Sequence, residues 1–220
     1  LKEGNLLGEG TTLEIFIDRD NRAGGSIISS QKVGPSIADD IKTSAVWSVV
    51  LALIAIGLYI LIRFNNIAFS IGATVALMVD TVLIIGAYSL CYGWMPFSLE
   101  IDQTFIGAIL TAIGYSINDT VVVFDRIRET IGLYPKRDRY QVINDALNST
   151  LSRTFNTSLT TLVVVLCIFI LGGATIRSFT FAILLGIIIG TYSTLFVATP
   201  IAYELQKKKI NKKAAAEAGK

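Results

Sequence analysis

Long apolar runs, each about as long as a helix needs to be to cross a bilayer, constrain this chain more than any other feature. The first run, TSAVWSVVLALIAIGLYILI at 43–62, has no charged residue and is flanked by Lys42 and Arg63. A membrane-spanning helix needs roughly 20 predominantly apolar residues. Further runs of this kind lie at 66–90, 103–124, 154–173 and 178–202. The sequence therefore predicts an all-α polytopic membrane bundle of five transmembrane helices.

Composition agrees with a membrane protein and excludes several kinds of chemistry. The chain is 52% hydrophobic and 16% charged, with a mean hydropathy of +0.61 and its charges clustered between the runs. It has no histidine and only two cysteines, Cys91 and Cys167. A disulfide framework, a Cys/His zinc site or a histidine proton relay is therefore not expected, and proton chemistry would use carboxylates. Phosphate-binding glycine loops and nucleophile elbows are absent from the sequence. We expect no enzyme activity, no metal or cofactor, and no nucleic-acid partner.

The ends of the chain differ from its apolar middle. In residues 1–36, TTLEIFIDRD and SIISSQKVG read as two strands joined by the turn NRAGG. Two strands alone bury too little to be stable, so we expect this segment to be the C-terminal remnant of a larger domain. The transmembrane domain is predicted at 37–205 and a basic tail at 206–220.

The distribution of basic residues predicts the orientation in the membrane. The segment 125–153 carries six lysines and arginines and the tail also carries six, whereas the loop at 91–102 carries none. The positive-inside rule therefore places 125–153 and the tail in the cytoplasm and the N-terminal segment outside. The basic tail also fits attraction to anionic membrane lipids. Within the segment 125–153, the apolar residues at 140–151 have the spacing of a helix. This helix either lies along the membrane surface or extends the fourth span.

Asp119, inside the third run, is the strongest functional signal. A charged Asp at the centre of a membrane helix costs on the order of 3 kcal/mol on insertion scales, so it should face a cavity or a partner. Ser116 and Tyr115 share its helix face. A carboxyl that alternates between apolar surroundings and a nearby cation is a reversible proton carrier. The alternative is a structural Asp that accepts a hydrogen bond from a neighbouring helix.

Arg153 is the predicted partner of Asp119. It opens a polar stripe on the fourth run, and if that helix packs on the third, its guanidinium could meet the Asp119 carboxylate. Equally, Arg153 could reach the cytoplasmic surface as a topology anchor. Asp80, midway along the second run, should point inward, for a structural hydrogen bond or for transport. GIIIG at 186–190 predicts a close helix contact. The possible supporting polar residues are Asp80, Ser116, Asn118, Asn156, Thr157 and Thr160.

Four segments together resemble the SecF family, over about residues 33–205. They read VGPSIADDI, GYSINDTVVVFDRIRE, LSRTFNTSLTT and RSFTFAILLGIIIGTYSTLFVATPIA. SecF is the smaller half of the SecD/SecF protein-export accessory, which some bacteria carry fused as SecDF, in the resistance-nodulation-division superfamily. Each half of such a protein has six spans with a periplasmic domain after the first. The resemblance therefore implies that the first span and most of a small α+β periplasmic domain precede this chain.

The resemblance also implies a function and a site. Such a protein is a subunit of the Sec machinery in the bacterial inner membrane, with a periplasmic N-terminal segment and a cytoplasmic C-terminus. It uses the proton-motive force to assist late translocation of secreted proteins. Its partners are the SecD half, the Sec translocon channel, the unfolded secreted polypeptide and membrane lipid. By motif position, Asp119 and Arg153 line the proton pathway, whereas Asp80 follows Val79 where the family often has His.

Several alternatives stay open at this level. The chain could be a half-transporter of the same superfamily that exports a small hydrophobic molecule or lipid. It could also be a translocon scaffold that conducts no ion. Proton and sodium coupling both suit oxygen ligands, and a separate SecF and the SecF half of a fused SecDF share these motifs.

Overall fold

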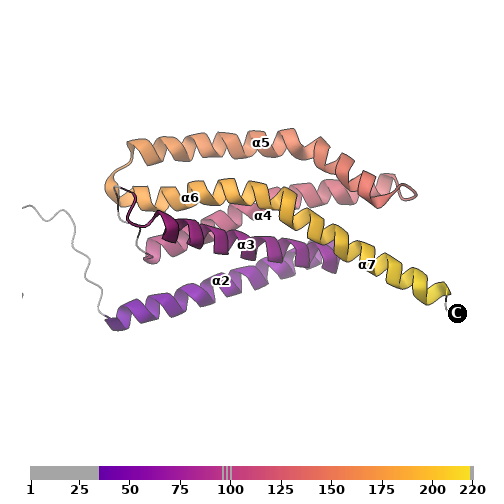
Figure 1. Cartoon of the computed structure of the whole chain (residues 1–220), viewed down its shortest axis with the longest axis horizontal. Coiled ribbons are helices and arrows are strands. Elements are labelled where there is room, and N and C mark those ends of the chain that lie inside the picture. The colour runs from indigo at the N-terminus through magenta and orange to yellow at the C-terminus, as the bar shows by residue number, and fades with distance from the viewer. Residues whose placement is uncertain (1–34, 96, 98, 100, 219–220) are drawn as a thin grey trace, which may run out of the picture. The chain divides into compact units, whose positions relative to one another are not determined.

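The computed structural model describes residues 35–95, 97, 99 and 101–218, and every regular element among them is a helix (Figure 1). The two predicted strands, and the α+β domain to which they would belong, lie outside the described residues. Pro35 is the first residue of the first described helix, where its fixed φ and missing N–H are tolerated.

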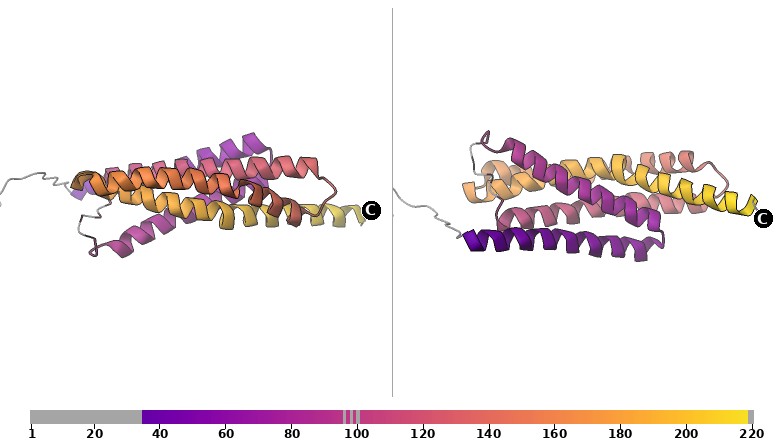
Figure 2. Two further views of the ribbon diagram at one scale, coloured as in Figure 1. Left: turned by 90° about the horizontal axis from the view of Figure 1, so that it is seen from above. Right: turned by 60° about the horizontal axis from the view of Figure 1, so that its bottom comes forward.

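Five of the helices are long and apolar enough to cross a membrane, as predicted. The first four are α2 (Pro35–Phe64), α3 (Ile67–Cys91), α4 (Gln103–Leu133) and α5 (Arg139–Leu171). The fifth begins as α6 (Ala174–Ser193), passes through a π-helical turn, η1 (Thr194–Ala198), and continues as α7 (Thr199–Ala218). In Figures 1 and 2, α7 projects past the end of α2.

Polar residues in the connecting loops define where three helices begin. The Asn66 side chain accepts a hydrogen bond from the Ala68 N–H at 3.0 Å, at the start of α3. Asp102 accepts one from the Phe105 N–H at 2.8 Å, at the start of α4. Asp138 does the same for α5, accepting from the Gln141 N–H at 3.4 Å. Each cap satisfies a backbone donor that has no partner inside the helix.

Helices α4 and α5 are longer than the apolar runs that predicted them. The segment 140–151 is part of α5, so the structure has the second of the two arrangements that the sequence left open, an extension of the fourth span. The reason is burial: Val142, Ile143 and Ala146 are buried, and the last two pack in one cluster with Phe124 and Ile127 of α4. Apolar residues at helical spacing thereby continue the α4–α5 contact beyond the apolar runs.

Helices α4 and α6 lie between α5 on one side and α2 on the other (Figure 1). Their contact is close because α6 presents glycine to α4. A Cβ atom at Gly186 would lie 2.3 Å from the Ala112 Cβ, and one at Gly190 would lie 2.8 Å from both the Cβ and the Oγ of Ser116. The close contact predicted from GIIIG is therefore confirmed, and its partner is α4.

This contact yields a stability prediction. Gly186→Ala should lower the free energy of unfolding by about 1–3 kcal/mol, because the added methyl group overpacks the α4–α6 contact. The matched control is Gly114→Ala on α4, where a Cβ would meet no atom within 4 Å. Reversible unfolding in mixed detergent micelles measures both. Equal stabilities for the two variants would contradict the close contact.

Candidate functional site

Asp119 is buried at the junction of three helices. Its side chain, on α4, is only 4% exposed, and its Oδ2 accepts a hydrogen bond from the Ser158 Oγ of α5 at 3.1 Å. The Thr191 Oγ1 of α6 in turn donates to the Ser158 Oγ at 2.8 Å. A chain of hydroxyl groups from two helices therefore ends on the carboxyl of a third. Asp119 faces its neighbouring helices, as the cost of a lipid-facing carboxylate requires.

A second carboxyl is buried nearby. Asp80 of α3 is 1% exposed, and its Oδ2 accepts a hydrogen bond from the Ser116 Oγ of α4 at 2.7 Å. Ser116 precedes Asp119 by three residues, so the two side chains lie on the same face of α4, about one turn apart. One turn after Ser116, the Thr120 hydroxyl of α4 shares a hydrogen bond of 2.9 Å with the hydroxyl of Thr194, the first residue of the π-helical turn. Both carboxyls thus belong to one buried polar layer of α3, α4, α5 and α6.

Arg153 lies beside this layer and is not in contact with Asp119. Its side chain is exposed, and no carboxylate of the described residues lies within 4.0 Å of it. Ser158, five residues further along α5, occupies the position against Asp119 instead. At the helical rise these two positions differ by about 7–8 Å along the axis. Arg153 is nevertheless close enough for its charge to act on the Asp119 carboxylate.

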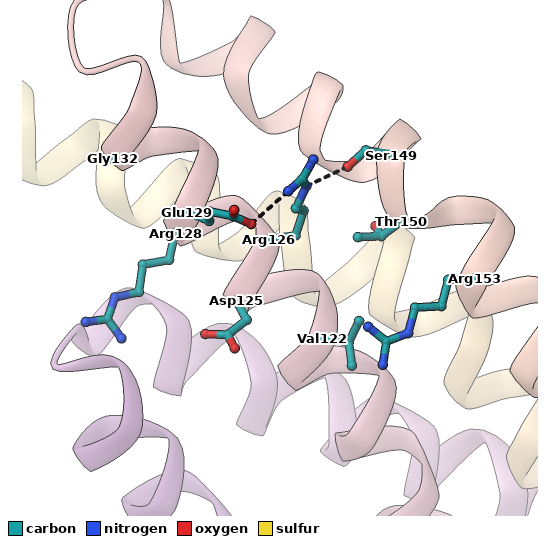
Figure 3. Close-up of a pocket in the computed structure, with 9 residues that line it drawn as sticks. All are labelled: Val122, Asp125, Arg126, Arg128, Glu129, Gly132, Ser149, Thr150 and Arg153. Atoms are coloured by element: carbon teal, nitrogen blue, oxygen red, sulfur yellow. Dashed lines mark hydrogen bonds and ion pairs between the residues drawn. The ribbon is translucent and has the colours of Figure 1, made fainter.

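The Arg153 side chain lines an open cavity of about 770 Å³ between α4 and α5 (Figure 3). Figure 3 shows the Arg126 guanidinium between Glu129 and Ser149. It donates to the Glu129 carboxylate at 2.8 Å and to the Ser149 Oγ at 3.0 Å. Asp125 pairs with Arg63 of α2 at 3.1 Å. Asp125, Arg126 and Glu129 are thus in ion pairs, whereas Arg128 and Arg153 have none among the described residues. The cavity is lined by Val122, Asp125, Arg126, Arg128, Glu129, Gly132, Ser149, Thr150 and Arg153.

The structure divides the predicted supporting residues into two groups. Asp80 and Ser116 are buried and hydrogen-bonded to each other. The second group is exposed on the outward faces of α4 and α5, and consists of Asn118, Asn156, Thr157 and Thr160. The hydroxyls of the two threonines in this group donate to backbone carbonyls of their own helix.

Ser158, which donates a hydrogen bond to Asp119, was not among the site residues predicted from the sequence. It belongs to a stripe of buried hydroxyl residues that recurs every four positions on α5, with Thr150 and Thr154. This periodicity is visible in the sequence, but the sequence does not show whether this stripe or the neighbouring one that begins at Arg153 faces α4. Thr191 was missed because nothing in the sequence of α6 states which helix it faces.

In the part of the chain that the structure describes, no three or more His, Cys, Asp or Glu residues come together in a way that could hold a metal ion.

A bundle of five apolar helices that encloses two carboxyls and a chain of hydroxyl groups is a polytopic membrane protein with a polar site at membrane depth. Residues 17–208 match the family model of the C-terminal part of the protein export membrane proteins SecD and SecF. The chain therefore belongs to the SecD/SecF family, which confirms the resemblance seen in its motifs.

Individual relatives agree with this assignment. Protein translocase subunit SecF of Rhodothermus marinus is 52% identical over 182 residues, which cover 83% of this chain and 59% of the relative. The SecF subunit of Petrotoga mobilis is 42% identical over 172 residues, which cover 78% of this chain and 55% of the relative. The chain thus spans little more than half the length of these relatives.

A solved structure shares the fold. The crystal structure of SecDF from Thermus thermophilus, described as a translocon-associated membrane protein, matches with a TM-score of 0.70 at 39% sequence identity. The match covers 80% of this chain and 23% of that chain.

The hydrogen bond to Asp119 yields a second prediction. Ser158→Ala should lower the free energy of unfolding by about 1–3 kcal/mol, because it leaves a buried carboxyl oxygen without its donor. Ser152→Ala, at an exposed position of the same helix, is the control and should cost less than about 0.5 kcal/mol. In an Asp119→Leu background the cost of Ser158→Ala should largely disappear. A cost that is unchanged in that background would contradict the assigned hydrogen bond.

Proposed function

We propose that this chain is part of a subunit of the Sec protein-export machinery that uses the proton-motive force to assist late translocation of secreted proteins. Its membership of the SecD/SecF family supports the export role. Relatives named protein translocase subunit SecF and a SecDF described as translocon-associated support it further. The observation that carries the ion coupling is the buried Asp119 carboxyl, held by Ser158 and flanked by Arg153, which has no ion pair among the described residues.

In this proposal Asp119 binds and releases the coupling proton. The ionised carboxylate attracts the Arg153 guanidinium and accepts the hydrogen bond from Ser158. Protonation removes the attraction to Arg153 and leaves a neutral acid at the α4–α5 contact. A change of a few kcal/mol between two helix arrangements shifts their populations strongly, so the protonation state selects the arrangement.

The cavity beside Arg153 supplies a route to water in this mechanism. It opens between α4 and α5 on the segment that the positive-inside rule assigns to the cytoplasm. A proton released from Asp119 would reach the cytoplasm past Arg153. Trp47 and Trp94, which are 62% and 90% exposed, would then lie near the periplasmic interface, where amphipathic rings are favoured. The chain would be a multi-pass protein of the bacterial inner membrane with a cytoplasmic C-terminus.

The exposed polar residues of α4 and α5 support a membrane partner. Asn118 and Asn156 face outward at membrane depth together with Thr157 and Thr160. Polar amide groups in contact with lipid tails cost free energy, so a second helical protein should cover them. We assign this face to the SecD half. The translocon channel and the unfolded secreted polypeptide are the further partners, and the Lys-rich end of α7 would meet anionic lipid.

The proposal predicts the effect of neutralising Asp119. Asp119→Asn keeps the shape of the side chain and cannot carry a proton, so export that depends on a proton gradient should be lost. Asp145→Asn is the control, because Asp145 is exposed, pairs with Arg137 at 2.9 Å and lies outside both the buried layer and the Arg153 cavity. The measurement is translocation of a secreted protein into inverted membrane vesicles with and without a proton gradient.

Two outcomes would contradict the proposal. Normal gradient-dependent export in Asp119→Asn would remove Asp119 from the mechanism and favour the scaffold. Dependence on a sodium gradient at constant pH, with no response to the proton gradient, would identify sodium as the coupling ion.

A further inference from the structure

We propose that Asp80 is a second proton-binding carboxyl, which exchanges a proton with Asp119 by way of the Ser116 hydroxyl. This inference rests on the proposed proton coupling and adds a second station to it. The proposal stands on the burial of Asp80, its hydrogen bond with Ser116 and the place of Ser116 one helical turn from Asp119 on α4.

The surroundings of Asp80 do not stabilise a permanent negative charge. The side chain is 1% exposed, and the Ser116 hydroxyl donates a hydrogen bond to its Oδ2. Its other oxygen, Oδ1, is buried and has no hydrogen-bond partner among the described residues. An ionised carboxylate taken out of water needs a cation or several donors, and serine hydroxyls alone do not meet this need. A neutral, protonated Asp80 fits the arrangement.

The groups that face this carboxyl from neighbouring helices are uncharged. Ser116 approaches from α4 and Ser193 from α6, and the Ser193 hydroxyl donates to the Gly190 carbonyl oxygen at 3.2 Å. No Lys or Arg of α2, α4, α6, η1 or α7 forms an ion pair with it among the described residues. Asp119 is the other carboxyl of the same buried layer. Among these residues no cation therefore balances an ionised Asp80, and its charge changes only when the carboxyl gains or loses a proton.

Ser116 connects the two carboxyls because a hydroxyl both accepts and donates. When the proton is on Asp80, the carboxyl O–H donates to the Ser116 Oγ across the 2.7 Å contact. The hydroxyl hydrogen of Ser116 is then free to donate towards Asp119, which lies one turn further along α4. The described residues include no direct bond between these two side chains, so one water molecule between them completes the path.

The transfer conserves protons and charge. The O–H bond of Asp80 breaks as its proton passes to the Ser116 Oγ, which gives up its own proton to the intervening water. The water passes a proton to the Asp119 carboxylate. The net result is one proton moved from Asp80 to Asp119 and one negative charge moved in the opposite direction. Asp80 would thus receive the proton before Asp119 on the way to the Arg153 cavity.

Helix α6 passes close to the Ser116 hydroxyl at Gly190. A Cβ atom at Gly190 would lie 2.8 Å from the Ser116 Oγ, so α6 can pack at this level only because the residue is glycine. Gly190→Ala would displace the Ser116 hydroxyl without removing any hydrogen-bonding group. It therefore perturbs the connection while both carboxyls remain.

The test is infrared carboxyl titration of the complete SecD–SecF complex in lipid. Wild-type protein should show two titrating carboxyl bands, one lost in Asp119→Asn and the other lost in Asp80→Asn. Ser116→Ala and Gly190→Ala should shift the Asp80 band, because they change its hydrogen bond with Ser116. Asp145→Asn, at the exposed carboxylate that pairs with Arg137, is the control and should keep both bands. Ser116→Ala and Gly190→Ala retain Asp80, so they test whether Asp80 titrates even where Asp80→Asn fails to fold.

The possible results separate this inference from the proposed function. If Asp119→Asn removes a band and Asp80→Asn, Ser116→Ala and Gly190→Ala leave the spectrum unchanged, Asp80 is structural and the inference is wrong while the proton coupling stands. If no carboxyl titrates in wild-type protein, the proposed function and this inference both fail.

Discussion

The cost of placing a carboxyl group inside a bilayer is the constraint on which the rest of this structure depends. Asp80 and Asp119 are buried in the bundle, and each accepts a hydrogen bond from a serine on another helix. These contacts require α3, α4, α5 and α6 to meet at one level, which ties the arrangement of the helices to the polar layer. Lipid tails give little hydrophobic drive for helix association, so interhelical hydrogen bonds and close packing hold the helices together instead.

Close packing between α4 and α6 makes the polar layer possible. Glycines at 186 and 190 let α6 approach α4 until a methyl group would overlap Ala112 or Ser116. Immediately after this contact α6 passes into the π-helical turn, and Thr194, its first residue, bonds to Thr120 of α4. Single π-helical turns inside α-helices are frequent at functional sites. The same few turns of α6 therefore set both the spacing of the helices and the position of the hydroxyl groups.

The sequence predicted the elements of this fold better than their contacts. Apolar runs were sufficient for the five spans, because length and hydropathy alone decide which segments can cross. The burial of Asp119 and Asp80 also followed from their cost in lipid. The partner of Asp119 did not, because helix rotation decides whether Arg153 or Ser158 faces α4, and rotation depends on packing against neighbours. Serine and threonine are too common in such helices for their sequence positions to identify a chain of hydroxyl groups.

Proton flux through the complete SecD–SecF complex tests the central claim most directly. The measurement uses proteoliposomes that contain a pH-sensitive dye and carry an imposed pH gradient, with sodium equal on both sides. The account predicts that wild-type complex dissipates the gradient and that Asp119→Asn reduces the flux to that of protein-free liposomes. Flux in Asp119→Asn equal to that of wild type would contradict it, because the proton would then cross the membrane without the carboxyl that the polar layer encloses.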